Sequence, residues 1–261
     1  MHQPSIGMTT HYAPIHGLNM YYEIHGAGNP LVLIHGGGST IQTSFGRVIP
    51  LFAKHRKVIA VEMQAHGRTG DRDADLTFEQ DADDIAALLQ HLNIPKADIL
   101  GFSNGGTTAL QTGIRHPEVV NRIIAISPLC KRHGAHAWFW DFMPQAKLEN
   151  MPQPLQDAYL EVAPDPNSLQ VMHDRDAKRM VNFKDIPDAL LQSIQAPTLI
   201  LAGDNDVVTP EHAQEMERII PNAKAVVIPG GHGACIGEIT TLTADTKETD
   251  FAVEMMEDFL G

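Results

Sequence analysis

The stretch that decides the fold runs from Gly101 to Gly106 and reads Gly-Phe-Ser-Asn-Gly-Gly. It follows the apolar run "ADIL" (97–100) and precedes "TTALQTGIRH" (107–116), which has the composition of a helix. Ser103 stands in the pattern G-x-S-x-G, in which a sharp turn between strand and helix exposes the serine hydroxyl. N–H groups at the start of the following helix favour negative charge above the serine. The stretch therefore predicts a nucleophile at Ser103.

A second glycine-rich stretch, His-Gly-Gly-Gly at 35–38, follows an earlier apolar run. A flexible loop or a phosphate cradle are alternatives, but neither G-x-x-x-x-G-K-[ST] nor G-x-G-x-x-G is present here. H-G-G-G is typical of loops that supply an oxyanion-hole amide. We therefore expect the N–H groups of Gly37 and Asn104 to form an oxyanion hole, and Gly36 and Phe102 to contact the substrate.

A serine nucleophile needs a base, and the base needs an acid that orients it. Asp204 and Asp206 follow the apolar run "PTLILAG" (197–203), and His232 lies between two glycines after "AKAVVIPG" (223–230). The chain has 14 histidines, so position matters more than residue type. The order Ser, Asp, His after successive runs predicts a catalytic triad with His232 as the base and one of the two aspartates as the acid.

Short apolar runs alternate with helical patterns along most of the chain. Six of these runs are continuous rather than alternating, which is typical of parallel strands buried on both faces; they begin at Pro30, Lys57, Ala97, Arg122, Pro197 and Ala223. Before them, "HYAPIHG" (11–17) and "NMYYEIHG" (19–26) predict an antiparallel hairpin at the sheet edge. The predicted fold class is α/β, with a mostly parallel central sheet flanked by helices.

Helix signals support this alternation. Thr77 and Gln80 predict a capping box before an apolar face formed by Phe78, Ala82, Ile85, Leu89 and Leu92. Thr209 with Pro210 predicts another helix start. Near the end of the chain, "FAVEMMEDFL" (251–260) predicts an apolar face at Phe251, Met255 and Phe259.

Residues 128–196 interrupt the alternation of apolar runs and helical patterns, because they contain helical stretches and seven prolines but no predicted strand. We interpret them as a helical cap (lid) inserted in a core domain of residues 1–127 and 197–261. The segment holds both tryptophans, Trp138 and Trp140, next to Phe142. These three rings are candidates for the substrate pocket; Trp138 and Phe142, four residues apart, can share a face from which Trp140 points away. Packing within the cap is the alternative.

These motifs together resemble the α/β-hydrolase family over nearly the whole chain: "HGGG", "GFSNGG", "GDNDVVTP" (203–210) and "GGHG" (230–233), in that order. The resemblance implies an α/β-hydrolase fold and selects Asp206 as the acid, because the family pattern G-x-x-D-x-x-x-P aligns on it and on Pro210. Asp204 is then a turn former. The family motif D-x-x-G-x-G-x-S is altered here, with Glu62 and Ala65 replacing its aspartate and first glycine. His66 within it is interpreted as structural.

Composition restricts the other possibilities. The net charge of -13 argues against a nucleic-acid partner, and no apolar run is long enough for a membrane span. The N-terminus has no signal-peptide pattern, so we expect a cytoplasmic protein. The spacing of Cys130, His133 and His136 is compatible with metal ligands, but no second cluster completes a site. We expect neither metal nor cofactor.

The predicted function is that of a serine esterase, which hydrolyses a small apolar ester or related acyl compound through an acyl-serine. Serine at position 103 argues against the dehalogenases and epoxide hydrolases of this fold, which resemble the chain but use aspartate there. C–C bond hydrolases and perhydrolases with the same triad remain alternatives. A non-catalytic receptor that binds a small ligand is a further alternative.

Overall fold

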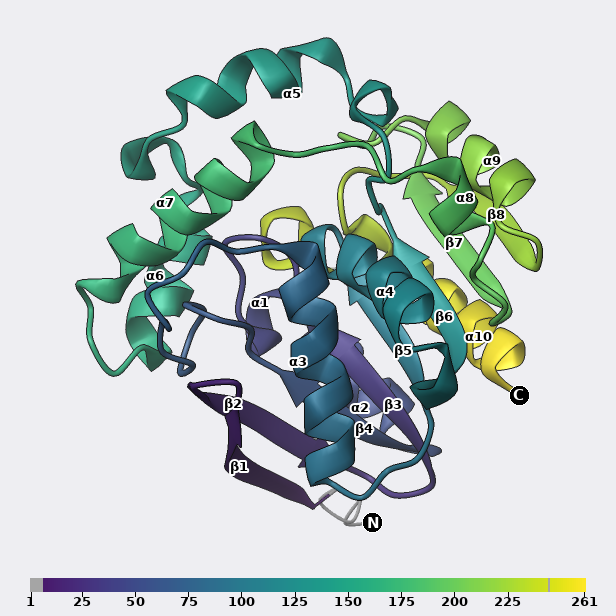
Figure 1. Ribbon diagram of the computed structural model, residues 1–261, viewed down its shortest axis with the longest axis horizontal. Coiled ribbons are helices and arrows are strands. Elements are labelled where there is room, and N and C mark those ends of the chain that lie inside the picture. Colours follow the sequence, from purple (N-terminus) through teal and green to yellow (C-terminus); the bar gives the residue numbers. More distant parts are fainter. Residues whose placement is uncertain (1–6, 244) are drawn as a thin grey trace.

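The centre of the protein is one eight-stranded sheet, seen in a computed structural model that describes residues 7–243 and 245–261 (Figure 1). The strand order is β1-β2-β4-β3-β5-β6-β7-β8. The hairpin of β1 and β2 is antiparallel and lies at the edge, β2 pairs antiparallel with β4, and every later pairing is parallel. This confirms the predicted fold class. The strands are β1 Met8–Ile15, β2 Leu18–His25, β3 Asn29–Ile34, β4 Arg56–Val61, β5 Ala97–Phe102, β6 Val120–Ile126, β7 Thr198–Gly203 and β8 Ala223–Ile228.

The middle strands are buried on both faces, as their continuous apolar runs predict. All six residues of β5 are buried, and so are the last four of β3, β4 and β6. In β8, at the other edge, only the first and last residues are buried. Burial of both faces requires helices on both sides of the sheet.

Two helical layers provide this cover. On one face α3 (Phe78–His91), α4 (Asn104–Arg115), α8 (Asp188–Leu191) and α9 (Pro210–Ile219) pack into one apolar cluster. On the other face α1 (Ile41–Phe45), α2 (Ile49–Phe52) and α10 (Lys247–Leu260) pack into a second cluster. In Figure 1, α3 and α4 lie in front of the sheet and α10 behind it. Short 3-10 turns cover Pro117–Val119, Arg132–Gly134, Met143–Gln145, Leu148–Asn150, Ala234–Ile236 and Ile239–Thr241.

Two of the helix predictions need correction. Thr77 caps α3 by accepting the N–H of Gln80, but the Gln80 side chain donates to Asp84 and does not close a capping box. In α10 the buried face is formed by Ala252, Val253, Met256 and Leu260, whereas Phe251 is 61% exposed. The buried face is therefore rotated by about one residue from the predicted face, because the prediction placed the largest side chains in the core. The start of α9 at Thr209 and Pro210 is confirmed.

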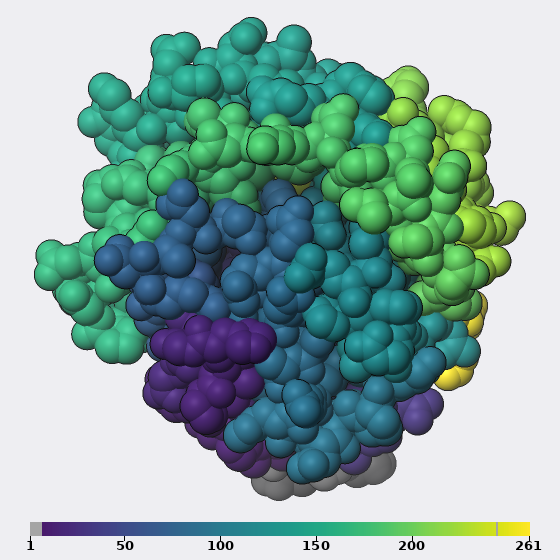
Figure 2. Space-filling view, in the orientation of Figure 1, coloured from purple at the N-terminus to yellow at the C-terminus, as the bar shows by residue number. Residues whose placement is uncertain are grey.

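The segment between β6 and β7 is helical and, within residues 128–196, contains no strand, as predicted. It comprises α5 (Ala137–Phe142), α6 (Gln153–Val162), α7 (Ser168–Val181) and α8, and a single bridge joins Ala135 to Val208. In Figure 2 this segment, coloured teal to green, lies at the top, opposite the purple N-terminal strands. None of the helices in the described residues has the length and apolarity of a membrane span.

Candidate active site

Ser103 lies at a turn that only a few residue types can form. Its φ of 55° is in the left-handed region, directly after β5 and before the first residue of α4. A Cβ on Gly101 would come within 1.9 Å of the Gly105 carbonyl oxygen, and one on Gly105 within 2.0 Å of the Ile34 carbonyl oxygen. The Ser103 N–H donates to the carbonyl of Ile126 at 2.8 Å and fixes the turn on β6. The glycines are therefore required by close backbone packing, as the motif predicted.

The three predicted triad residues lie in one chain of hydrogen bonds. His232 Nε2 is 2.9 Å from Ser103 Oγ, and His232 Nδ1 is 2.6 Å from Asp206 Oδ1. Because an ionised carboxylate only accepts, Nδ1 carries the proton, and Nε2 is left with a lone pair that can accept the serine proton. This is the tautomer that a general base next to a serine nucleophile requires.

Asp206 is buried and held by four donors. Besides His232, the hydroxyl of Ser127 donates to Oδ2 at 2.5 Å, and the N–H groups of Gly203 and Val208 lie at 3.2 and 3.3 Å. Burial acts to raise the pKa of Asp206, but the hydrogen bond and charge of His232 and the bond from Ser127 lower it below its ordinary value. Asp204, in contrast, is exposed and accepts the N–H of Gly230. The geometry favours Asp206 as the acid.

The candidate oxyanion hole lies beside the serine. Gly37 and Asn104 border the same cavity as Ser103, and their N–H groups have no acceptor among the described residues. Gly36 and Phe102 do not border this cavity. A Cβ on Gly36 would lie 3.0 Å from the Phe102 ring, which packs behind His232 with ring centres 4.8 Å apart. These two residues support the nucleophile and the base.

The cavity above Ser103 has a largely apolar wall built by the helical segment. The aromatic residues of α5 divide between this wall and other surroundings. Phe142 lines the cavity together with Phe139, whereas Trp138 is 56% exposed and stacks on His136. Trp140 points away, packs on Phe183 and donates its Nε1–H to the Arg132 carbonyl. The larger apolar side chains of the wall are Phe139, Phe142, Met143, Met151, Leu155, Met172 and Met180.

Phe139, Phe142 and Met143 are three and four residues apart, so they can share one helical face. Trp138 is four residues from Phe142 but one from Phe139 and five from Met143, so it cannot share a face with all three. Trp138 stands outside that face, which differs from the expectation that it would join Phe142.

Comparisons with known proteins identify the family of the chain. A family model described as the alpha/beta hydrolase fold matches residues 29–184. The chain belongs to the α/β-hydrolase family. A 2-hydroxy-6-oxo-6-(2'-aminophenyl)hexa-2,4-dienoic acid hydrolase of Metapseudomonas resinovorans is 25% identical over 241 residues, which cover 84% of this chain and 83% of that protein.

Two further matches extend over most of this α/β hydrolase. The serine hydrolase BPHL of Homo sapiens is 25% identical over 245 residues, with 86% of this chain and 80% of that protein covered. The crystal structure of a serine hydrolase involved in carbazole degradation superposes with a TM-score of 0.79 at 24% identity, covering 97% of this chain and 99% of the other. The latter likeness supports the fold alone.

A buried group of charged residues links the helical segment of this α/β hydrolase to the glycine-rich loop. Asp176 of α7 accepts the Gly38 N–H at 2.6 Å and His66 Nε2 at 2.8 Å, both on Oδ2. Its other oxygen accepts Arg179 Nη2 at 2.6 Å, and Arg179 Nη1 donates to Asp81 at 2.7 Å. Burial acts to raise the pKa of Asp176, but the positive charges of His66 and Arg179 hold it below the ordinary value.

Two neighbouring histidines in this region, with ring planes tilted by 47°, have pKa values shifted in opposite directions. His66 has an acceptor at each ring nitrogen, the Gln64 carbonyl at Nδ1 (2.8 Å) and Asp176 at Nε2, which suits the cationic form. Burial acts to lower its pKa, but the Asp176 carboxylate raises it above the ordinary value. His35, 4.8 Å away, accepts the Met63 N–H on Nε2 and is neutral, since burial and the charge of His66 lower its pKa to about 3. Sequence reasoning interpreted His66 as structural and missed its partner Asp176.

The altered motif after β4 forms a closed turn. Glu62 accepts the Arg68 N–H at 2.6 Å and Arg68 Nη1 at 2.8 Å, and a Cβ on Gly67 would lie 2.4 Å from the Glu62 carboxyl group. Ala65 has a φ of 64°, which explains why the family motif has glycine there. The turn holds His66 in place and has no part in the triad.

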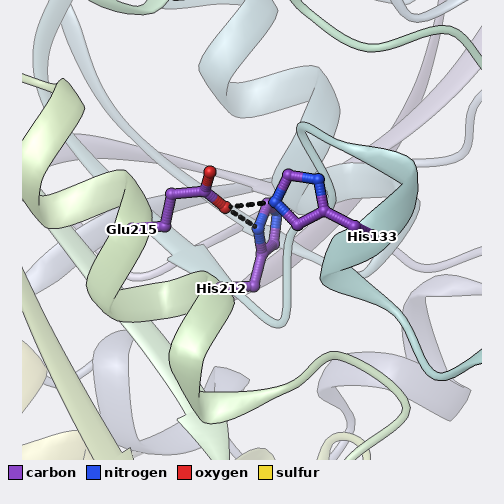
Figure 3. Close-up of side chains that lie close together, drawn as sticks. All are labelled: His133, His212 and Glu215. Carbon is purple, nitrogen blue, oxygen red and sulfur yellow. Dashed lines mark hydrogen bonds and ion pairs between the residues drawn. The ribbon is translucent and has the colours of Figure 1, made fainter.

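Three side chains that are capable of binding a metal lie together outside the active site: His133, His212 and Glu215 (Figure 3). Glu215 Oε2 is 2.8 Å from His133 Nε2 and 2.9 Å from His212 Nδ1. The Cys130 N–H donates to His212 Nε2 at 3.1 Å, so the ring proton is on Nδ1 and points at Glu215. Metal binding through Nδ1 would move this proton to Nε2, where it would oppose the Cys130 N–H. The group is therefore satisfied as a hydrogen-bonded link between residues 130–133 and α9. His136, whose spacing from Cys130 and His133 is compatible with metal binding, is not part of this group and stacks on Trp138.

Proposed function

We propose that this α/β hydrolase is a serine hydrolase that cleaves a small, apolar carboxylic ester or related acyl compound through an acyl-serine intermediate. The observation that carries the proposal is the continuous hydrogen-bond chain from Ser103 Oγ through His232 to buried Asp206. The N–H groups of Gly37 and Asn104, which have no acceptor in the part of the chain that the structure describes, border the same cavity. The largely apolar wall suits an alkyl or aryl group.

The mechanism follows from these positions. Ser103 Oγ attacks the carbonyl carbon while its proton passes to His232 Nε2, and the Gly37 and Asn104 amides stabilise the oxyanion. Asp206 stabilises the resulting imidazolium through its bond to Nδ1. The alcohol leaves with the proton from His232. A water molecule then gives a proton to His232 and attacks the acyl carbon, and collapse of the second oxyanion releases the acid and restores the serine.

The test is ester hydrolysis with 4-nitrophenyl esters of increasing acyl length, together with labelling by a serine-directed phosphonate. Ser103→Ala should lower kcat by roughly 10⁴–10⁶-fold with little change in thermal stability. Pre-steady-state kinetics should show a burst of 4-nitrophenol, as expected for acyl-enzyme accumulation. Label on any serine other than Ser103 would contradict the assignment. Absence of turnover and of labelling would favour the receptor alternative.

C–C bond hydrolysis is the second candidate, because one relative that aligns over most of the chain is named a hexa-2,4-dienoic acid hydrolase. The same triad can serve this reaction, so the distinction depends on what the pocket holds. Comparison of kcat/KM for a 2-hydroxy-6-oxo-dienoate and for short esters separates the two. A large preference for the dienoate would replace the ester proposal.

A further inference from the structure

The charged residues around the cavity carry an inference about the substrate that rests on the proposed function. Among the described residues that border the cavity, Lys147, His173 and Asp176 have ionisable side chains. The Lys147 side chain is 71% exposed, which places it at the rim, and His173 Nδ1 lies 3.0 Å from the Asp174 carboxylate. Asp176, with a side chain only 13% exposed, is the buried charge of the wall.

Both cations behind Asp176 are already paired. His66 donates to one oxygen of Asp176, and Arg179 donates to the other and to Asp81. Two carboxylates and two cations therefore balance within this group. Arg179 Nε has no acceptor among the described residues, but Arg179 does not border the cavity, and its guanidinium lies 4.7 Å from the centre of the Phe78 ring. No cation deep in the described wall is left for a ligand.

This arrangement has a consequence for the acyl group. A carboxylate that enters an apolar cavity loses its hydration, and the loss is offset only when a cation or several donors replace the water. Here a ligand carboxylate would meet mainly methionine and phenylalanine side chains and the oxygens of Asp176, and the amide side chains of Asn104 and Asn150 offer it uncharged donors but no cation. An uncharged alkyl group meets no such penalty.

We propose that the site takes an uncharged acyl group and discriminates against acyl groups that carry a carboxylate, and that Asp176 sets this preference by neutralising His66 and Arg179. Asp176 is thus a specificity-determining residue for the proposed hydrolysis.

The experiment compares two esters that differ only at the far end of the acyl chain. 4-Nitrophenyl valerate ends in a methyl group, and mono-4-nitrophenyl glutarate has a carboxylate in its place. The methyl ester of the latter is a neutral control of similar size. We expect kcat/KM to favour valerate over the glutarate half-ester by roughly 100-fold, and the methyl-capped ester to remain a substrate. Comparable or faster turnover of the half-ester, as recruitment by Lys147 would produce, overturns the proposal.

Removing the negative charge of Asp176, or the positive charge of its partner Arg179, tests the role of Asp176. Asp176→Asn leaves Arg179 less neutralised and should raise the relative kcat/KM of the half-ester by about tenfold. Arg179→Gln should shift the ratio in the opposite direction. Asp157→Asn, which removes an exposed charge from α6 at a residue that does not border the cavity, should leave the ratio unchanged. A ratio compares two substrates on one enzyme, so a smaller folded fraction cancels. If kcat/KM changes by the same factor for both substrates in every variant, Asp176 has only a structural role.

The pH dependence gives a second readout. His66 is faced by Asp176, by the carbonyl of Gln64, by Arg179 and by neutral His35. Without the Asp176 charge, the pKa of His66 should fall, so His66 remains cationic only at lower pH. The gain of Asp176→Asn for the half-ester should therefore be larger at pH 6 than at pH 8. A gain that is independent of pH would exclude His66 from the explanation.

A binding measurement keeps this inference separate from the proposed function. Pentylboronic acid and its 4-carboxybutyl analogue form adducts with an activated serine without turnover. Tighter binding of the pentyl compound, lost in Ser103→Ala, would support the charge preference even if no ester in the panel is hydrolysed. Ester hydrolysis with equal binding of both compounds would leave the proposed function standing and remove the charge preference. Failure of both compounds to bind, together with absent hydrolysis, would remove both proposals.

Discussion

Ser127 offers a sharp test of how the triad is supported. The residue directly follows β6, has a φ of 51° and donates its hydroxyl to Asp206 Oδ2 at 2.5 Å. Ser127→Ala removes one of four donors to this carboxylate. A hydrogen bond to a charged acceptor contributes about 1.5–3 kcal/mol, and the three remaining donors should compensate part of the loss. We therefore expect kcat/KM to fall by about 3- to 30-fold.

The pH profile tests whether the effect passes through Asp206. Because the pKa of Asp206 is lowered in the folded protein, its ionised form stabilises the fold above the ordinary aspartate range, and this stabilisation is lost as pH falls through the folded pKa. Ser127→Ala should raise that pKa, so the variant lacks part of the stabilisation that wild type has above the ordinary aspartate range. The difference in free energy of unfolding between wild type and variant, measured in urea, should therefore be largest near neutral pH and should shrink as pH falls through the aspartate range.

Ser127→Gly is the matched control, since it also lacks the hydroxyl but relieves the positive φ. It should lose as much activity as the alanine variant while being more stable. If Ser127→Ala lowers activity as much as Asp206→Asn, or leaves both activity and the acidic unfolding profile unchanged, the hydrogen bond to Asp206 does not have the role inferred here.

Three further predictions concern the acid, the wall and the buried charges. Asp206→Asn should lower kcat by about 10⁴-fold because the imidazole loses its proper tautomer, whereas Asp204→Asn should change it by far less; reversed effects in steady-state assays would transfer the role to Asp204. Phe142→Ala should lower kcat/KM for hexanoate esters by roughly tenfold and for acetate esters much less, whereas exposed Trp138→Ala should change neither; a uniform change across acyl lengths would remove Phe142 from the pocket wall. The raised pKa of His66 means that its stabilisation is present below the ordinary histidine value and is lost as pH rises through the folded pKa. The difference in unfolding free energy between wild type and His66→Gln should therefore shrink from about pH 6.5 upward, and a constant difference would show that His66 does not gain charge on folding.

The sequence predicted the sheet, and it singled out the three residues that the structure joins by hydrogen bonds, because both depend on local signals. Continuous β-branched runs lie in buried parallel strands, and the glycines around Ser103 are required by contacts within the turn itself. His232 and Asp206 could be found because each follows a strand at the same edge of the sheet. Ser127 satisfies the same rule at the end of β6, but a lone serine has no motif to distinguish it.

The remaining site residues could not be predicted for a different reason. Asp176 lies 110 residues from His66 and 138 from Gly38, and no periodicity in the chain links such positions. Its charge in α7 fits an ordinary solvated helix face until the fold brings the glycine-rich loop against it. Trp138 is the opposite case, because its sequence position predicted a place in the pocket and the structure shows it exposed. Residue type alone did not indicate which rings face the cavity.

The helical segment is tied at two places to the loops that carry Asp206 and Gly37, which under the proposed function would join specificity to catalysis. At one end, Ala135 pairs with Val208, two residues after Asp206, and the Thr209 N–H donates to the Gly134 carbonyl at 2.8 Å. At the other, Asp176 accepts the N–H next to the candidate oxyanion amide of Gly37. The same segment supplies the apolar wall, so a shift that changes the pocket also moves the supports of the acid and of the oxyanion loop. Substitutions within the wall should therefore be compared by ratios between substrates, because a change in kcat alone would not distinguish a lost contact from a displaced loop.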